Sequence, residues 1–318
     1  MKFALLAALA LAGLAALALW KARAHEARAE AAFPPEGRLI EVNGHRVHAV
    51  VTGDGPDLVL IHGASGNARD LTFDLAPRLA ARYRVIVLDR PGLGHTGRID
   101  ADGASITEQA ALLQAAAAAL GAERPVVLGH SYGGAVALAW AVTRPETLAA
   151  LVSLAGASHP WQSALPLQYR LLSHPLIGPL LAPVLSALVS DAYVERAVAG
   201  IFAPQDMPAG YLAHVGAALT LRRATLRENA LQRANLLGEI EALHPRYPRI
   251  SVPVEIVHGD RDTTVGLAVH AEPLARAVPD SRLTVLPGIG HMPHHAAPEA
   301  VIAAIDRAAR RAGLNPAP

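Results

Sequence analysis

A serine flanked by glycines stands between a predicted strand and a predicted helix. The motif is G-x-S-x-G at residues 129–133, which follows the apolar run 125–128 and precedes the helical run 135–143. Glycine at both ends allows a tight, strained turn that lifts a hydroxyl clear of the sheet, where a Cβ would crowd the neighbouring backbone. A serine that only caps a helix would not need these glycines. We therefore predict that Ser131 is a nucleophile.

A serine hydroxyl is a poor nucleophile unless a base takes its proton, so a histidine and an acid must lie elsewhere in the chain. The chain has 15 histidines, and His291 differs from the others because it opens a loop directly after the last predicted strand. Two aspartates, Asp260 and Asp262, follow the strand before it. We predict that His291 is the base and Asp262 the acid. The alternative acid, Asp260, fits better as a turn residue or an arginine partner.

An acyl-transfer site also needs N–H groups that stabilise the negative charge developing on the carbonyl oxygen. One expected donor is the backbone N–H of Tyr132, the residue after the serine. The loop 62–67 follows a buried strand, and its small residues let the backbone approach a substrate. We predict that the N–H of Ala64 is the second donor. His62, in the same loop, is expected to brace it through side-chain hydrogen bonds.

The elements that position these residues alternate between strands and helices. Residues 38–42 and 46–51 alternate apolar and polar side chains about Asn43-Gly44, which predicts a hairpin. Later short apolar runs are continuous, as in strands buried on both faces. The pattern predicts an α/β fold with a mostly parallel sheet, helices on both faces and the antiparallel hairpin at one edge. The expected parallel strands are 58–61, 85–88, 126–128, 148–154, 254–257 and 283–286.

One long stretch interrupts this alternation. Residues 158–250 contain no β-rich run, only helical pieces separated by nine prolines, and the stretch is too long to be a loop. We predict a helical insertion here, an α/β core formed by 33–157 and 251–318, and a separate N-terminal segment over 1–32. The insertion is rich in leucine, which favours a mainly apolar substrate.

The N-terminal segment begins with 18 uncharged residues, 3–20, dominated by alanine and leucine. At ~1.5 Å per residue they span about 27 Å, close to the roughly 30 Å hydrocarbon core of a bilayer. A charged, alanine-rich spacer follows over 21–32. We predict an uncleaved membrane anchor. The alternatives are a signal peptide cleaved near 22–24, although its apolar part would be unusually long, and a buried globular helix.

The charges that flank this anchor indicate two opposite orientations. Lys2 at the inner face would place the body of the protein in the periplasm or outside the cell, and cleavage would instead release a secreted protein. Basic residues on the other side weaken this orientation. They are Lys21, Arg23 and Arg28.

Composition excludes several other functions. The chain has no cysteine, which rules out thiol nucleophiles, thiolate zinc sites and disulfides, and its net charge of +1 argues against nucleic-acid binding. His291, His294 and His295 could resemble a metal site, but Pro293 prevents a helix from aligning an i,i+3 pair of them. No glycine-rich nucleotide motif has the required strand and helix around it. We predict no metal and no cofactor.

A group of arginines in the insertion is expected to form a solvated helix face, with contact to an anion or lipid headgroup as the alternative. These residues are Arg222, Arg223, Arg227 and Arg233.

Taken together, these motifs resemble the α/β-hydrolase superfamily of the serine type with a helical cap. The resemblance covers roughly 36–309 and includes the loop 89–95 and the segment 290–295. It implies an α/β-hydrolase fold in which Ser131 is the nucleophile. Relatives of the dehalogenase and epoxide-hydrolase type carry aspartate there, which argues against both activities. The remaining roles implied are the acid Asp262, the base His291, and the oxyanion donors Ala64 and Tyr132.

Three functions are consistent with the sequence. The first is hydrolysis of carboxylic esters, including lactones, through an acyl-enzyme, with a small ester-like molecule as substrate. The second uses the same three residues for carbon–carbon bond hydrolysis of a diketone, or for cofactor-free perhydrolysis. The third is a non-catalytic scaffold that binds a ligand or partner. Scaffolds of that kind usually lack a member of the triad, which argues against the third function. The first two differ through cap side chains that the sequence does not place, and we favour the first.

Overall fold

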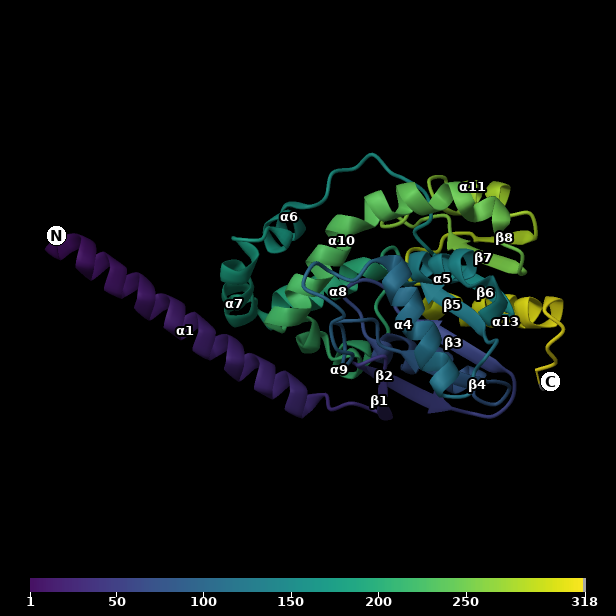
Figure 1. The fold of residues 1–318 in the computed structure, drawn as a ribbon, viewed down its shortest axis with the longest axis horizontal. Coiled ribbons are helices and arrows are strands. Elements are labelled where there is room, and N and C mark those ends of the chain that lie inside the picture. The colour runs from purple at the N-terminus through teal and green to yellow at the C-terminus, as the bar shows by residue number, and fades with distance from the viewer. Residues whose placement is uncertain (317–318) are drawn as a thin grey trace.

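The computed structural model describes residues 1–316 and shows one eight-stranded sheet with helices on both sides (Figure 1). The strand order is β1-β2-β4-β3-β5-β6-β7-β8. β2 is antiparallel to β1 and β4, and the later pairings are parallel, so the predicted fold class is confirmed. The strands are β1 (Arg38–Val42), β2 (His45–Thr52), β3 (Asp57–Ile61), β4 (Arg84–Leu88), β5 (Val126–His130), β6 (Ala150–Leu154), β7 (Val254–Gly259) and β8 (Ser281–Leu286).

The hairpin between β1 and β2 has the turn that the sequence predicts. Asn43 and Gly44 both have positive φ, 51° and 78°. Two successive residues of this kind give a turn whose twist matches that of the flanking strands. The hairpin forms one edge of the sheet.

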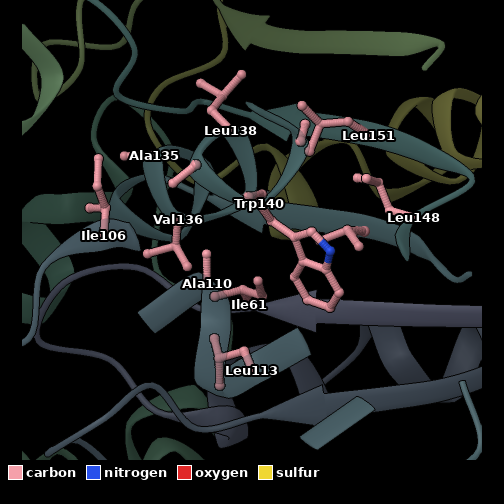
Figure 2. Close-up of a cluster of buried hydrophobic side chains, with 14 of the residues drawn as sticks. Ile61, Ile106, Ala110, Leu113, Ala135, Val136, Leu138, Trp140, Leu148 and Leu151 are labelled. Atoms are coloured by element: carbon pink, nitrogen blue, oxygen red, sulfur yellow. The ribbon is translucent and has the colours of Figure 1, made fainter. Parts of the chain in front are cut away.

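The central strands are buried on both faces, as their continuous apolar runs predict. Successive side chains of a strand point to opposite faces. Val59 and Ile61 of β3 therefore join the core shared with α4 (Ile106–Ala119) and α5 (Tyr132–Thr143), where Trp140 is also buried (Figure 2). Leu58 and Leu60 of the same strand join the opposite core. That second core includes residues of α2 (Ala68–Thr72), α3 (Leu75–Leu79) and α13 (Pro298–Arg311).

The chain between β6 and β7 forms helices and no strand over residues 155–253, all of which the structure describes. We call the part from 158 to 250 the cap. Its longest helix, α10, has 21 residues and packs against α6 and α7. The cap helices are α6 (Leu167–Ser173), α7 (Gly178–Leu188), α8 (Asp191–Phe202), α9 (Tyr211–Val215) and α10 (Arg223–Leu243), with 3-10 turns η2 (Ala217–Leu221) and η3 (His244–Arg249).

Helix α1 (Lys2–Ala32) continues without a break from the apolar segment through the stretch expected to be a spacer. Its first half projects away from the body (Figure 1), and its most apolar 18-residue window is not buried within the protein. The interpretation of this segment as a buried globular helix is therefore wrong. By length and hydropathy it is the one helix of the described chain that could cross a membrane.

The second half of α1 packs on the cap, against α7 and η2. Ala22 is buried there, and Glu26 accepts hydrogen bonds from the guanidinium of Arg223 at 2.8 Å. Glu30, one turn further along, pairs with Arg222. Two of the arginines expected on a solvated face thus contact α1. The sequence does not reveal this packing because the paired residues are almost 200 positions apart.

Candidate active site

Ser131 occupies the turn between β5 and α5, and its backbone conformation is strained. Its φ of 54° lies in the left-handed region that residues with a side chain seldom adopt. A Cβ on Gly129 would overlap the carbonyl oxygen of Gly133, and a Cβ on Gly133 would overlap that of Ile61. The glycines are therefore required by close backbone packing, as the motif predicts.

Three side chains from distant parts of the sequence form a row of hydrogen bonds. Ser131 Oγ lies 2.9 Å from His291 Nε2, and His291 Nδ1 lies 2.7 Å from Asp262 Oδ2. All three residues are buried, and they follow β5, β8 and β7. Because the carboxyl ends of parallel strands meet at one edge of a sheet, the fold itself brings them together. With a proton on Nδ1, His291 can accept the hydroxyl proton of Ser131 at Nε2.

The environment of Asp262 keeps its carboxyl group ionised. Its Oδ1 accepts the backbone N–H groups of Thr264 and Val265 at 2.8 and 2.9 Å. Burial by itself would raise the pKa of Asp262. The contacts of this carboxylate with His258 and His291, together with the backbone donors, instead hold that pKa far below its usual range. A permanent negative charge therefore lies beside Nδ1 of His291, where it would stabilise an imidazolium.

Asp260, the alternative acid, has a different environment. It is exposed, and its Oδ1 accepts the backbone N–H of Gly288 at 2.7 Å. This contact joins the loops after β7 and β8. The structure thus places Asp262, rather than Asp260, against His291.

The two expected oxyanion donors lie beside Ser131. Tyr132 is the first residue of α5, where backbone N–H groups have no acceptor within the helix. Ala64 lies in the loop after β3 and lines the same cavity as Ser131. A Cβ on the neighbouring Gly63 would come within 3.1 Å of Ser131 Cβ, so this loop lies directly against the serine.

Arg90 holds this loop, a role that no pattern in the sequence indicates. The guanidinium is fully buried and donates to the carbonyl oxygens of His62 and Gly63, both at 3.1 Å. It also lies over the ring of Tyr132, 4.2 Å from the centroid. His62 accepts the backbone N–H of Arg90 at Nε2 and donates from Nδ1 to Gly63, so it braces the loop as predicted. Arg90 therefore contacts Tyr132, one expected donor, and Gly63, the residue next to the other.

A second buried polar group adjoins the Ser131–His291–Asp262 row, and the sequence does not reveal that Asp70 belongs to it. Asp70 of α2 accepts hydrogen bonds from Tyr211 of the cap at 2.8 Å and from His295 at 2.9 Å, and His294 approaches both its oxygens at 3.3 Å. Burial alone would raise the pKa of Asp70, but the two histidines hold it well below its usual range. His130 donates from Nε2 to the backbone carbonyl of His291, 2.9 Å away. These contacts fix the loop that carries His291.

The donor set of this group also resembles a metal site. Ligand atoms of Asp70, His294 and His295 lie within 4.8 Å of one another. A histidine that binds a metal normally donates its other ring N–H to an acceptor. Nδ1 of both histidines has no partner among the described residues. The hydrogen bonds to Asp70 account for this cluster better than a metal ion does.

We expect Asp70→Asn to lower the free energy of unfolding by about 2–4 kcal/mol, because three buried donors would lose a charged acceptor. Urea unfolding at neutral pH measures this loss. The control is Asp74→Asn, on the half-exposed carboxylate that pairs with Arg78, where the expected loss is below ~1 kcal/mol. Since the pKa of Asp70 is lowered in the folded state, its contribution is present above about pH 4 and disappears in stronger acid. Equal losses in the two variants would contradict the role given to Asp70.

A cavity of about 770 Å³ lies between the core and the cap, and Ser131 and His291 form part of its wall. Its volume falls in the upper part of the range for small-molecule sites, roughly 300–1,000 Å³. Most of the remaining wall is apolar and comes from the cap. These residues include Leu172, Leu185, Leu188, Val194, Val198, Ile201, Phe202, Val215, Leu221 and Leu226.

Known proteins are similar to this chain in amino-acid sequence. RutD of Pseudomonas savastanoi pv. phaseolicola, described as a candidate carbamate hydrolase, is 31% identical over 255 residues, which cover 78% of this chain and 91% of RutD. An uncharacterized protein of Mycobacterium tuberculosis is 28% identical over 287 residues, which cover 86% of this chain and 81% of that protein.

Solved structures share the fold. An α/β hydrolase fold protein from Burkholderia ambifaria has a TM-score of 0.70 and 27% identity, over 85% of this chain and 96% of its own. The pattern of the Alpha/beta hydrolase family matches residues 58–304, which is most of the chain. The chain belongs to the alpha/beta hydrolase family.

Proposed function

We propose that this protein hydrolyses carboxylic esters, including lactones, of mainly apolar character through an acyl-enzyme. The observation that carries this proposal is the hydrogen-bonded row Ser131–His291–Asp262 in the wall of a largely apolar cavity. An ester is a suitable substrate because the serine oxygen can attack its carbonyl carbon. Its alkyl groups can pack against the apolar wall of the cavity.

In the proposed reaction, Ser131 Oγ attacks the ester carbonyl while His291 Nε2 takes the hydroxyl proton. The N–H groups of Ala64 and Tyr132 stabilise the negative oxygen of the tetrahedral intermediate. His291 then gives the proton to the departing alcohol, and the C–O bond breaks to leave an acyl-serine. Water, deprotonated by the same imidazole, releases the acid. Asp262 holds the imidazole in the required tautomer and stabilises its positive form.

The same residues could serve carbon–carbon bond hydrolysis of a diketone, or perhydrolysis. The likeness to RutD adds a carbamate as a third type of bond to test. In each case Ser131, His291 and Asp262 activate an oxygen nucleophile, and the side chains of the cap select the substrate.

The direct test is labelling of the purified full chain with a fluorophosphonate, followed by a substrate panel. We expect mass spectrometry to find the phosphonate on the peptide that contains Ser131. Esters of apolar acids should be hydrolysed faster than diketones or carbamates. Absence of both labelling and hydrolysis would favour a non-catalytic scaffold, and a faster rate on a diketone would favour carbon–carbon hydrolysis.

The rate should depend on pH through a single proton. Protonated His291 cannot accept the Ser131 proton, so kcat/KM for a neutral ester should fall about tenfold per pH unit on the acid side. Protonation of Asp262 should not contribute to this pH dependence, because the pKa of Asp262 lies far below its usual range. Initial rates from roughly pH 5 to 9 measure this, with circular dichroism confirming that the protein stays folded. A flat profile would contradict a histidine base.

We also propose that residues 1–32 attach the protein to a membrane, with the core (33–157 and 251–318) and cap (158–250) in the periplasm or outside the cell. The exposed apolar half of α1 supports this arrangement. Cell fractionation tests it: the full-length chain should sediment with membranes and resist extraction by salt. A soluble chain that begins near residue 25 would instead identify a cleaved signal peptide and a secreted protein.

A further inference from the structure

Helix α7 of the cap carries a row of leucine and valine side chains that the protein leaves uncovered. Leu180, Val184 and Leu188 recur every four residues and are 75%, 38% and 67% exposed, and Leu176, in the turn just before α7, is 76% exposed. Residues four apart lie on one face of a helix. α7 contains no charged residue. Its 11 residues span only about 16 Å, too little to cross a bilayer.

This uncovered row lies next to the part of α1 that could enter a membrane. The second half of α1 packs against α7, and α7 lies on the side of the body from which the first half projects (Figure 1). If the apolar half of α1 spans a bilayer, the row on α7 lies at its surface. Contiguous apolar surface of this kind, beside a membrane-inserted helix, matches the boundary between lipid headgroups and acyl chains.

Exposed residues at the end of this row also belong to the wall of the cavity that contains Ser131. Leu188, at the end of the row, is 67% exposed and also lines the cavity. Tyr193 and Ile201 of α8 are likewise both exposed and part of the cavity wall. The apolar surface of α7 therefore continues into the apolar wall that leads to the serine.

We infer that the substrate is a membrane lipid ester whose acyl chain passes directly from the bilayer into this cavity between α7 and α8. The inference rests on the proposed function, because the bond broken is still a carboxylic ester. Ser131 takes the acyl group, the lipid alcohol leaves with the proton from His291, and water then releases the free fatty acid. The row on α7 holds the opening of the cavity against the lipid.

The absence of cysteine from the chain allows a direct test of the membrane contact. The full-length variants Leu180→Cys and Val285→Cys each receive an environment-sensitive fluorophore and are reconstituted into phospholipid vesicles. Val285 is the control because it is an exposed apolar residue on β8, at the other end of the body (Figure 1). Vesicles with brominated acyl chains then report whether lipid touches the label.

We expect the fluorophore at 180 to shift to the blue and to be quenched by brominated lipid, while the fluorophore at 285 does neither. A blue shift at 180 without quenching would mean that a second copy of the protein covers α7, and would overturn the inference. An unquenched, unshifted label, or a chain that does not associate with vesicles, would overturn it as well.

Rates on two substrates connect this contact to catalysis. The double variant Leu176→Asp/Leu180→Asp changes exposed side chains outside the cavity wall. We expect its rate on a fluorogenic phospholipid within vesicles to fall about tenfold or more, because two charges oppose contact with the bilayer, while its rate on p-nitrophenyl butyrate stays within about twofold. Val285→Asp should change neither rate.

The outcomes separate this inference from the proposed function. If the wild-type protein hydrolyses p-nitrophenyl butyrate but not the phospholipid, or if the double variant cleaves the phospholipid at the wild-type rate, only the lipid inference fails. If the wild-type protein hydrolyses neither substrate, the proposed function fails too.

Discussion

Replacing Ser131 by alanine should lower kcat/KM for an ester by roughly 10⁴–10⁶-fold and abolish fluorophosphonate labelling. The hydroxyl supplies the only bond to the acyl group in the proposed reaction, so what remains is the catalysis provided by substrate binding and the oxyanion donors. Steady-state kinetics of the purified variant measure the loss.

The fold should tolerate this change. Alanine retains the Cβ that serine already places at a φ of 54°, so the strain of the turn stays the same. Thermal unfolding should therefore shift by only a few degrees. A variant that is folded and still hydrolyses the ester at the wild-type rate would show that another residue is the nucleophile.

Asp262→Asn should lower kcat by about 10³–10⁴-fold, the second largest effect we expect. An amide has no negative charge to stabilise the imidazolium. Its NH₂ group can also face Nδ1 of His291 and so favour the tautomer with the proton on Nε2, which cannot accept the Ser131 proton. The measurement is kcat at saturating ester and neutral pH.

The matched control is Asp260→Asn, two residues away in the same loop. Asp260 is exposed and contacts the backbone of Gly288 rather than His291, so we expect kcat to stay within about threefold of the wild-type value. The opposite ranking of the two variants would mean that Asp260 is the acid in solution.

The sequence predicted features that depend on neighbouring residues. Alternation and continuous apolar runs identified the strands because burial on one or both faces follows directly from the period of two. The motif at 129–133 identified the turn because its glycines are needed for close backbone contacts within the turn and with β3. Asn43-Gly44 identified the hairpin through its positive φ values.

The sequence predicted that Asp262 and His291 lie near each other only because the order of the strands shows which loops meet. Residues that follow adjacent parallel strands come together at one sheet edge, so two loops could be selected without a structure. The sequence favoured Asp262 over Asp260, although both lie in the same loop. The direction of each side chain, set by the turn after β7, places Asp262 against His291.

Other features were decided by tertiary structure alone. Asp70 contacts His294 across 224 positions, and Glu26 contacts Arg223 across 197. No period or short motif relates residues so far apart, because their contact depends on how the cap and α1 pack on the core. The same packing joins the second half of α1 to the cap and forms the cavity wall beside α7. The sequence by itself therefore determined the fold class and the candidate nucleophile, base and acid, since these follow from local geometry and strand order. The supporting network and the shape of the cavity required the packed side chains.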